Sequence, residues 1–351
     1  MLDIPDDLTT VAPLRKRRGD ADPTTTLLEE ALFEAKKVLV GQDAMIERLF
    51  VCLLARGHCL LEGAPGLAKT LAAETMATIV GGSFARLQFT PDLVPADLIG
   101  TRIYRPSQEA FDVELGPVFA NVVLADEINR APAKVQSALL EVRSEQQVSI
   151  GGVTHPVPSP FFVLATQNPI ESEGVYPLPE AQRDRFLMKV VVDHPSDREE
   201  AEIARRMSVD PPRASRLLDP QRLIELQREA ELVFVHDGVL DYAVRLVSAT
   251  RRPAQHSMPE LDGVIAHGAS PRGTLGLLKA SRALAMLRGR RYALPQDVFD
   301  VSRDVLRHRV LLGYDAVADG VEADQVVERI LGTVPAPRVA PAQGDLTEVA
   351  S

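Results

Sequence analysis

A short loop between an apolar segment and a helical segment constrains the fold of this chain more than any other feature. A mainly apolar run at 50–54 and 58–61 leads into Gly63-Ala64-Pro65-Gly66-Leu67-Ala68-Lys69-Thr70, and a helical pattern follows. Strand, glycine-containing loop, Lys-Thr and helix, in that order, are typical of a phosphate-binding loop. Amides at a helix start attract an anion, Lys69 adds positive charge, and Thr70 supplies a hydroxyl for Mg²⁺.

The loop departs at one position from the pattern G-x-x-x-x-G-K-[ST], because Ala68 stands where the pattern has glycine before the lysine. An alanine costs nothing there if the residue adopts helical dihedral angles. The alternative interpretation is a glycine-rich turn that caps an ordinary helix. The strand–loop–helix context favours the phosphate-binding loop.

Polar side chains end two further apolar strands. The strand at 122–124 leads into Asp126 and Glu127, and the strand at 161–165 leads toward Asn168. In a parallel sheet the carboxyl ends of strands meet at one edge, so these groups are expected beside the phosphate-binding loop. Asp126 can then hold the Mg²⁺ shell, Glu127 can polarise a water molecule, and Asn168 can bind the terminal phosphate or that water. Charged strand ends that simply face solvent, and an Asn-Pro turn, are the alternatives.

The order of the elements predicts an α/β fold. Five strands, interleaved with helices, are expected at 58–62, 84–89, 122–126, 161–165 and 188–192. They predict a five-stranded parallel sheet with helices on both faces. From residue 195 onward the apolar spacing is helical almost throughout, which predicts a C-terminal helical lid. The predicted divisions are a flexible N-terminal tail at 1–23, an α/β nucleotide-binding domain at 24–194, the lid at 195–333 and a flexible C-terminal tail at 334–351.

Two local predictions follow from residue chemistry. Asp43 is expected to be the N-cap of a helix that runs to residue 55. Gly151 and Gly152, between two β-like segments at 147–150 and 153–157, predict a hairpin with a two-residue turn.

Composition excludes several classes of function. A net charge of -10 and an aromatic content of 5% disfavour a nucleic-acid-binding protein, since such proteins need basic surfaces and stacking side chains. Cys52 and Cys59 lie in the apolar run before the loop, where reduced buried thiols are expected. No apolar run reaches the roughly 20 residues that span a bilayer, and no secretion signal opens the chain. A cytoplasmic protein without membrane insertion is therefore expected.

Several motifs at domain-scale spacing resemble those of the MoxR family of AAA+ ATPases. The resemblance covers roughly residues 25–333, and its further motifs are Gln88-Phe89-Thr90-Pro91-Asp92, Leu124-Ala125-Asp126-Glu127-Ile128-Asn129-Arg130-Ala131-Pro132, Ala165-Thr166-Gln167-Asn168-Pro169, Leu178-Pro179-Glu180-Ala181-Gln182, Asp184-Arg185-Phe186 and Gly268-Ala269-Ser270-Pro271-Arg272. Several motifs in the same order identify a family far more specifically than the phosphate-binding loop does alone.

The resemblance implies a role for each matching residue. It makes 63–70 the Walker A loop, Asp126 and Glu127 the Walker B pair, and Asn168 sensor 1. It also makes Arg185 an arginine finger that acts on the ATP of a neighbouring subunit, and Arg272 sensor 2, which reports the γ-phosphate to the lid. The segment Val40-Gly41-Gln42 would lie beside the adenine, 91–117 would be the helix-2 insert, and 148–157 would be a hairpin before sensor 1.

The family further implies a Mg-ATP hydrolase that works as a homo-oligomer, typically a hexameric ring. Its members have a chaperone-like role on partner proteins, often ones with a von Willebrand A-type domain. This chain departs from the family at Arg183, where an apolar residue is usual, and at 141–146, which replaces a Glu-Ala-Met-containing segment. Arg185 is assigned as the finger because its Asp-Arg-Phe frame is intact, and Arg183 is a candidate to assist it.

Three other functions are compatible with the same motifs. A magnesium-chelatase-like motor subunit differs mainly in its partner. A replicative-helicase-like motor is disfavoured by the acidic net charge. A nucleotide-switched binding scaffold with little hydrolysis is disfavoured by the presence of Glu127, Asn168 and Arg185.

Overall fold

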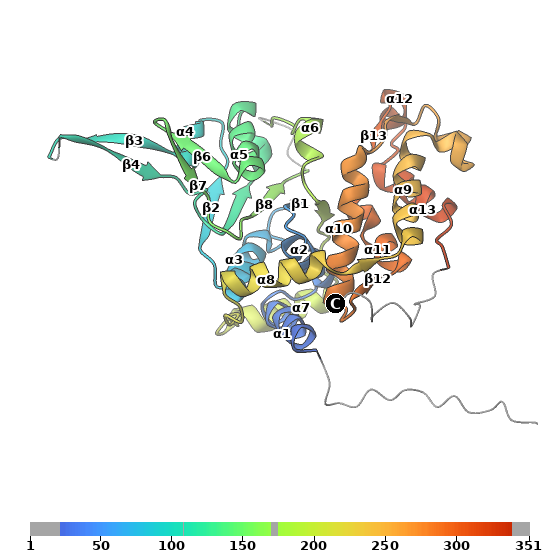
Figure 1. Ribbon diagram of the computed structural model, residues 1–351, viewed down its shortest axis with the longest axis horizontal. Coiled ribbons are helices and arrows are strands. Elements are labelled where there is room, and N and C mark those ends of the chain that lie inside the picture. The colour runs from blue at the N-terminus through green and yellow to red at the C-terminus, as the bar shows by residue number, and fades with distance from the viewer. Residues whose placement is uncertain (1–21, 108, 170–174, 339–351) are drawn as a thin grey trace, which may run out of the picture.

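Five parallel strands form the centre of the molecule. The computed structural model describes residues 22–107, 109–169 and 175–338. The strand order across the sheet is β2-β5-β8-β1-β9 (Figure 1). The strands are β1 Cys59–Glu62, β2 Phe84–Gln88, β5 Val122–Asp126, β8 Phe162–Gln167 and β9 Met188–Val191. All four neighbouring pairs are parallel, which confirms the predicted sheet.

The three central strands of this sheet, β5, β8 and β1, are buried on both faces, which explains why they are mainly apolar runs. In β5, for example, Val122 and Leu124 join one hydrophobic cluster while Val123 and Ala125 join the other. Helices cover the two faces, with α2 and α3 below the sheet in Figure 1 and α4 and α5 above it. The helices of the α/β region are α1 Pro23–Val38, α2 Asp43–Leu54, α3 Lys69–Val80, α4 Pro95–Ile99, α5 Ala133–Glu145 and α6 Glu180–Arg183.

Two hairpins interrupt the α/β order. One consists of β3 Gly100–Arg105 and β4 Ala110–Leu115, and it extends away from the rest of the molecule (Figure 1). The other consists of β6 Gln147–Ile150 and β7 Val153–Pro156. Its turn residues Gly151 and Gly152 have φ values of 58° and 85°. Glycine adopts such angles without strain, so the predicted two-residue turn is confirmed.

The C-terminal part is mainly helical, as predicted. Its helices are α7 Asp197–Ser208, α8 Pro220–Glu231, α9 Asp237–Arg251, α10 Pro271–Leu287, α11 Pro295–Leu306, α12 Tyr314–Ala318 and α13 Ala323–Thr333. Sequence periodicity missed two short ladders here, β10 Phe234–Val235 with β12 Tyr292–Ala293 and β11 Ile265–His267 with β13 Leu311–Leu312. Strands of two or three residues are too short to give a repeating pattern.

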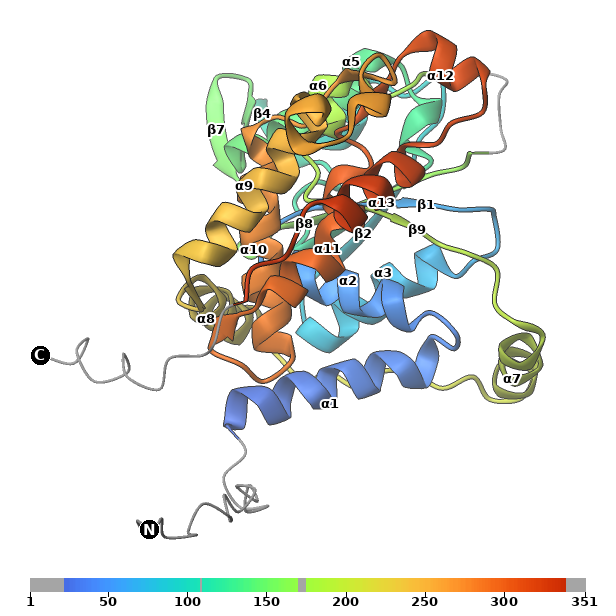
Figure 2. The same cartoon turned by 90° about the vertical axis from the view of Figure 1, so that its right-hand side faces the viewer.

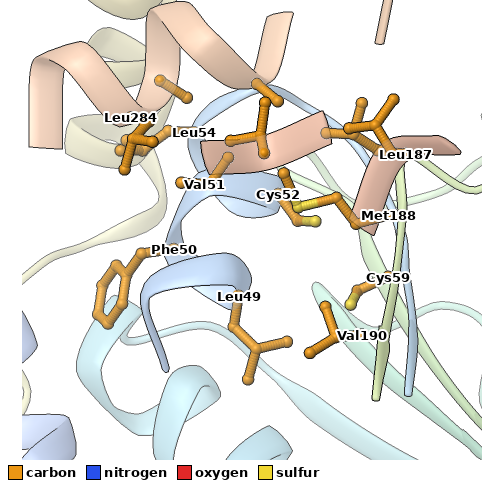
Figure 3. Packing of buried hydrophobic residues seen from close by; sticks show 14 of the residues in the cluster. Leu49, Phe50, Val51, Cys52, Leu54, Cys59, Leu187, Met188, Val190 and Leu284 are labelled. Carbon is orange, nitrogen blue, oxygen red and sulfur yellow. The ribbon is translucent and has the colours of Figure 1, made fainter. Parts of the chain in front are cut away.

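Helix α2 joins the sheet to the helical part. Its side chains meet β1 and β9 on one side and Leu284 of α10 on another (Figure 3). A partly buried ion pair adds to this contact, because Nε of Arg48 lies 2.7 Å from a carboxylate oxygen of Asp304 in α11. One hydrophobic cluster therefore runs from α1 through α2 into the lid helices. The hydrophobic core is therefore continuous between the two domains that the sequence predicts. Their boundary at residue 195 stays a prediction.

Three smaller predictions have clear outcomes. Gln42, and not Asp43, is the N-cap of α2, and Asp43 lies in the first turn. Asp43 still favours the helix there through the helix dipole. Both cysteines are buried and free, as expected. The tail predictions fall largely on 1–21 and 339–351, which lie outside the described residues. In the described ranges, no helix combines the length and apolar character that crossing a membrane needs.

Candidate functional site

The phosphate-binding loop connects β1 to α3, and Lys69 is the first residue of the helix. Nζ of Lys69 donates a hydrogen bond to the carbonyl oxygen of Gly63 at 2.6 Å, so its charge lies within the loop. A Cβ atom at Gly63 would stand 2.7 Å from the carbonyl oxygen of Val192, so no other residue fits without movement. Gly66 has a φ of 85°, which favours glycine. The backbone of the loop therefore requires glycine at both positions, and its binding of phosphate stays a prediction.

Ala68 does not have the right-handed helical dihedrals expected from the sequence. It is the N-cap of α3 with φ 56° and ψ 22°, in the left-handed region. An L-residue other than glycine pays about 1–2 kcal/mol in this conformation. Alanine in place of glycine at position 68 is therefore strained, whereas the sequence alone predicts no conformational cost.

Asp126 ends β5 with its carboxylate fixed from two sides. One oxygen accepts a hydrogen bond from Oγ1 of Thr166 at 2.7 Å, and the other lies 2.7 Å from Nη2 of Arg86. Asp126 is only 8% exposed, so these two contacts fix the orientation of its carboxylate. Sequence reasoning assigned no role to Thr166 or Arg86. Both residues lie on strands that flank β5, Thr166 on β8 and Arg86 on β2, and this position is the feature that could have pointed to them.

Glu127 has a strained backbone at the end of the same strand. Its φ of 55° is unusual for a residue with a side chain, and its amide donates to Oγ1 of Thr166 at 2.8 Å. Its carboxylate accepts from Nε2 of Gln88 at 2.9 Å and lies 3.0 Å from Nε of Arg130. Strain of this kind collects at functional sites, since the surrounding structure must hold it.

Lys69, Asp126 and Asn168 lie at one edge of the sheet, as predicted. β8 lies between β1 and β5, so the residue after β8 stands between the ends of the other two strands. Asn168 is 5% exposed at this position. Nζ of Lys69 also reaches the carbonyl oxygen of Gln167, the last residue of β8, at 3.4 Å. The three strand ends therefore face a common space, while the chemical role of each residue remains a prediction.

The residues at this edge fit a Mg²⁺ ion shared with a phosphate ligand. No group of three or more His, Cys, Asp or Glu side chains suited to a metal occurs in the described part of the chain. Thr70 and Asp126 offer one hydroxyl and one carboxylate. Mg²⁺ in phosphate-transfer sites is commonly held by one or two carboxylates together with substrate phosphates. The ion would therefore depend on the nucleotide for most of its ligands.

A cavity of about 720 Å³ adjoins the phosphate-loop helix. Its lining includes Val38 at the end of α1, Leu71 and Thr75 on α3, and Met207 on α7. Leu39 ends α1 as its C-cap, the segment Val40-Gly41-Gln42 comes next, and Nε2 of Gln42 donates to the carbonyl oxygen of Asp193 at 3.2 Å. This segment therefore lies where the α/β region passes into the helical part.

Arg185 and Arg272 are at the opposite edge of the sheet. Both line a second cavity, of about 390 Å³, together with Gly57 and His58, which directly precede β1. Figure 2 shows the same separation, with α10 on the left and the loop between β1 and α3 on the right. Within one chain the structure does not bring these two arginines to Lys69. The expected contact of Arg272 with a phosphate therefore cannot be made to a nucleotide in the loop of its own chain.

Asp184 joins the segment that carries Arg185 to the helical part. Its carboxylate accepts from Oγ of Ser270 at 2.9 Å and lies 3.5 Å from Nη1 of Arg272. It also lies 2.9 Å from Nε of Arg309, which donates further to the carbonyl oxygen of Asp184 at 2.9 Å and of Leu187 at 3.1 Å. Arg185 itself donates to Oγ of Ser144 at 2.6 Å. The segment with Arg185 is therefore held by lid residues.

Arg309 holds this segment in place, and the sequence alone did not point to it. It is 6% exposed, and burial lowers its pKa to about 10 despite the nearby Asp184 carboxylate, which raises it. No local pattern marks it, since Asp184 and Leu187, to which it donates, lie more than a hundred residues away along the chain. Arg183, proposed to assist Arg185, does not line the cavity that holds Arg185 and Arg272.

Comparisons with known proteins agree with this geometry. Residues 58–188 match the model of the ATPase family associated with various cellular activities (AAA), and residues 262–330 match the AAA lid domain. The chain is 60% identical over 319 residues to Chaperone MoxR1 of Mycobacterium tuberculosis, covering 90% of this chain and 85% of that protein. The chain belongs to the MoxR family of AAA+ ATPases.

Two further proteins are similar to this chain over comparable lengths. Protein MoxR of Methylorubrum extorquens is 34% identical over 349 residues, covering 92% of this chain and 99% of that protein. A crystal structure of a protein from Cytophaga hutchinsonii superposes with a TM-score of 0.85 at 44% identity, covering 90% of this chain and 96% of that one. The α/β sheet with its helical lid is thus shared with that protein.

Proposed function

We propose that this MoxR-family protein hydrolyses Mg-ATP in a ring of identical copies. The observation that carries the proposal is the separation of its charged groups. Lys69, Asp126 and Asn168 lie at one edge of the sheet, and Arg185 and Arg272 lie at the other. A neighbouring copy that presents its arginines to the phosphate-binding loop completes the site, so catalysis requires an assembly.

Each residue at the loop edge has a distinct task in this proposal. Lys69 and the amides of 63–70 bind the outer phosphates, and Thr70 and Asp126 hold Mg²⁺, the latter through water. The ion supplies neutralisation of the negative charge that grows on the phosphate oxygens. Asn168 positions the terminal phosphate or the attacking water. The adenosine part is proposed to lie near Val40-Gly41-Gln42 and the cavity beside α3.

Glu127 is proposed to polarise the attacking water. Its carboxylate is engaged by Gln88 and Arg130, so these contacts must loosen before it can accept a proton. Its strained backbone fixes the direction of the side chain and reduces the reorganisation needed for the reaction.

Arg185 and Arg272 are proposed to act on the ATP of the neighbouring copy. An arginine supplied by a second subunit stabilises the charge of the transition state and can raise the rate by about 10³–10⁵. Because Asp184 links the segment that carries Arg185 to Arg272 and Ser270 of the lid, hydrolysis at one site would be transmitted to the lid of the adjacent copy. Family resemblance suggests six copies in the ring.

The work done by the ring is proposed to be chaperone-like remodelling or activation of a partner protein. Chaperone MoxR1, the relative at 60% identity, bears this activity in its name. The partner would be a protein with a von Willebrand A-type domain, encountered in the cytoplasm. The hairpin β3–β4 offers a contact surface, since Tyr104 and Phe111 are half exposed and their ring centroids are 5.2 Å apart.

The variant Glu127→Gln tests the hydrolytic assignment. It should retain binding of ATP and lose steady-state phosphate release, because the amide keeps the size of the side chain but cannot accept a proton. The exposed Glu141→Gln, on α5, is the matched control and should behave as wild type. Hydrolysis by Glu127→Gln at the wild-type rate would refute the assignment. Absence of hydrolysis in the wild-type protein would favour the nucleotide-switched scaffold instead.

A further inference from the structure

The cavity at the amino edge of the sheet carries an excess of positive charge. Its lining includes six basic side chains and one carboxylate, that of Asp184. The basic residues are Arg56, Arg143, Arg185, Arg272, Lys279 and Arg309. We call this space the arginine cavity.

Arg143, on α5, has no anionic partner among the described residues. It is 5% exposed, and its two terminal nitrogens, Nη1 and Nη2, are buried without a hydrogen-bond partner. Its guanidinium carbon lies 4.4 Å from the ring centroid of Phe186. An aromatic face offsets only a small part of the cost of burying a charge. Arg143 therefore retains an uncompensated charge in the wall of the cavity.

The one carboxylate of the cavity is already engaged. One oxygen of Asp184 pairs with Arg309, and the other accepts from Ser270 and lies near Arg272. Burial, followed by repulsion from Arg185, Arg272 and Arg309, lowers the pKa of Arg143 to about 9. The side chains that face Arg143 thus add positive charge and leave it unneutralised.

We propose that Arg143 adapts the arginine cavity to a phosphate group by supplying charge from the inner wall, while Arg185 and Arg272, whose contact with phosphate belongs to the function proposed above, touch the ligand. A phosphate group fits better than a single carboxylate, since its two charges and several oxygens match several guanidinium groups at once. Arg143 belongs to the segment 141–146, where the sequence departs from the family resemblance. Arg143 is a positioning residue, because it acts on the phosphate through the electrostatic field in the cavity.

The phosphate has two chemical sources. One is the terminal phosphate of ATP held by a neighbouring copy, and this source rests on the proposed function. The other is free inorganic phosphate bound by the single chain. Both share the same chemistry, and the two arms of the following experiment distinguish them.

The first arm measures phosphate binding without hydrolysis. The full chain carrying Lys69→Ala, which weakens the loop at the other edge, is titrated with inorganic phosphate at constant ionic strength while its thermal unfolding midpoint is followed. The midpoint should rise with phosphate, because a ligand that binds only the folded state stabilises it. Adding Arg143→Met should weaken the apparent affinity at least tenfold, and adding Arg143→Lys should restore part of it.

Arg282→Met is the matched control for this arm. Arg282, on α10, also buries Nε without a hydrogen-bond partner, but it does not line the arginine cavity. It should leave the phosphate response unchanged. Two results would overturn the proposal, whatever the protein does with ATP. One is an equal phosphate response in Lys69→Ala and in the double variant Lys69→Ala, Arg143→Met. The other is the absence of any phosphate response in Lys69→Ala.

The second arm identifies the source by measuring ATP hydrolysis with Lys69 intact. If the neighbour's ATP is the ligand, Arg143→Met should lower kcat at least tenfold, leave binding of ATP to the loop unchanged, and regain activity as Arg143→Lys. If free phosphate is the ligand, kcat should be unchanged while the first arm still shows the loss. Failure of the wild type to hydrolyse ATP would remove the proposed function and leave the first arm valid.

Discussion

Replacement of Arg309 by methionine should destabilise the nucleotide-free protein strongly. Arg309 is nearly buried, pairs with Asp184 at 2.9 Å and donates to the carbonyl oxygens of Asp184 and Leu187. Methionine fills a similar volume but leaves these acceptors without a donor. Removal of one partner of a buried ion pair costs about 3–5 kcal/mol. With an m-value of about 3 kcal/mol per molar urea, the unfolding midpoint should fall by about 1–1.7 M.

Urea unfolding followed by far-ultraviolet circular dichroism measures this loss. Arg329→Met is the matched control, because Arg329 and Glu260 form an ion pair of 2.7 Å in which both side chains are about half exposed. Solvent screens such a pair, so its loss should barely move the midpoint. Equal midpoints for Arg309→Met and Arg329→Met would refute the view that Arg309 fixes the segment carrying Arg185.

Two further predictions concern stability. Ala68→Gly should raise the free energy of unfolding by about 0.5–1 kcal/mol, because relief of the left-handed strain exceeds the added flexibility of the unfolded chain; calorimetry of the nucleotide-free protein measures it. Burial holds the pKa of His58 and of His308 well below 6.5, so both are neutral in the native state. Below about pH 6.5 the unfolded chain binds protons that the native chain does not, and stability should fall by up to about 1.4 kcal/mol per pH unit for each histidine.

Both predictions have outcomes that would contradict them. In a right-handed helix Ala68→Gly would destabilise the protein by about 1 kcal/mol, so the sign of the change decides between the two conformations. For the histidines, the double variant His58→Gln, His308→Gln should flatten the decline between pH 7.5 and 5.5, while the exposed His267→Gln should not. An unchanged decline in the double variant would show that other groups cause it.

The sheet and its loop edge could be predicted from local sequence. Strands buried on both faces must be apolar throughout, and the polar residues that end them identify the edge that meets solvent. Asp126 and Asn168 were found in this way, and the order of strands then brought them to Lys69. The two-residue turn at Gly151-Gly152 was equally local, since only its backbone angles matter.

The arrangement at the other edge depends on contacts between distant segments. α10 is held against α2 by packing of Leu284 and its neighbours, and this packing decides that Arg272 lies with Arg185 and away from Lys69. The sequence immediately around each arginine does not show at which edge of the sheet it lies. The dihedral angles of Ala68 were also beyond the sequence, because the motif fixes the order of residues but not the backbone angle of a substituted one.

A mixture of two inactive variants tests the central claim most directly. Lys69→Ala cannot hold ATP but keeps Arg185, and Arg185→Ala holds ATP but lacks the arginine that the neighbour needs. Each variant alone should release little phosphate, and the mixed assembly should regain hydrolysis, because an intact loop then faces an intact arginine. If mixed assemblies form and stay inactive, the two edges of the sheet do not meet across copies, and the account is wrong.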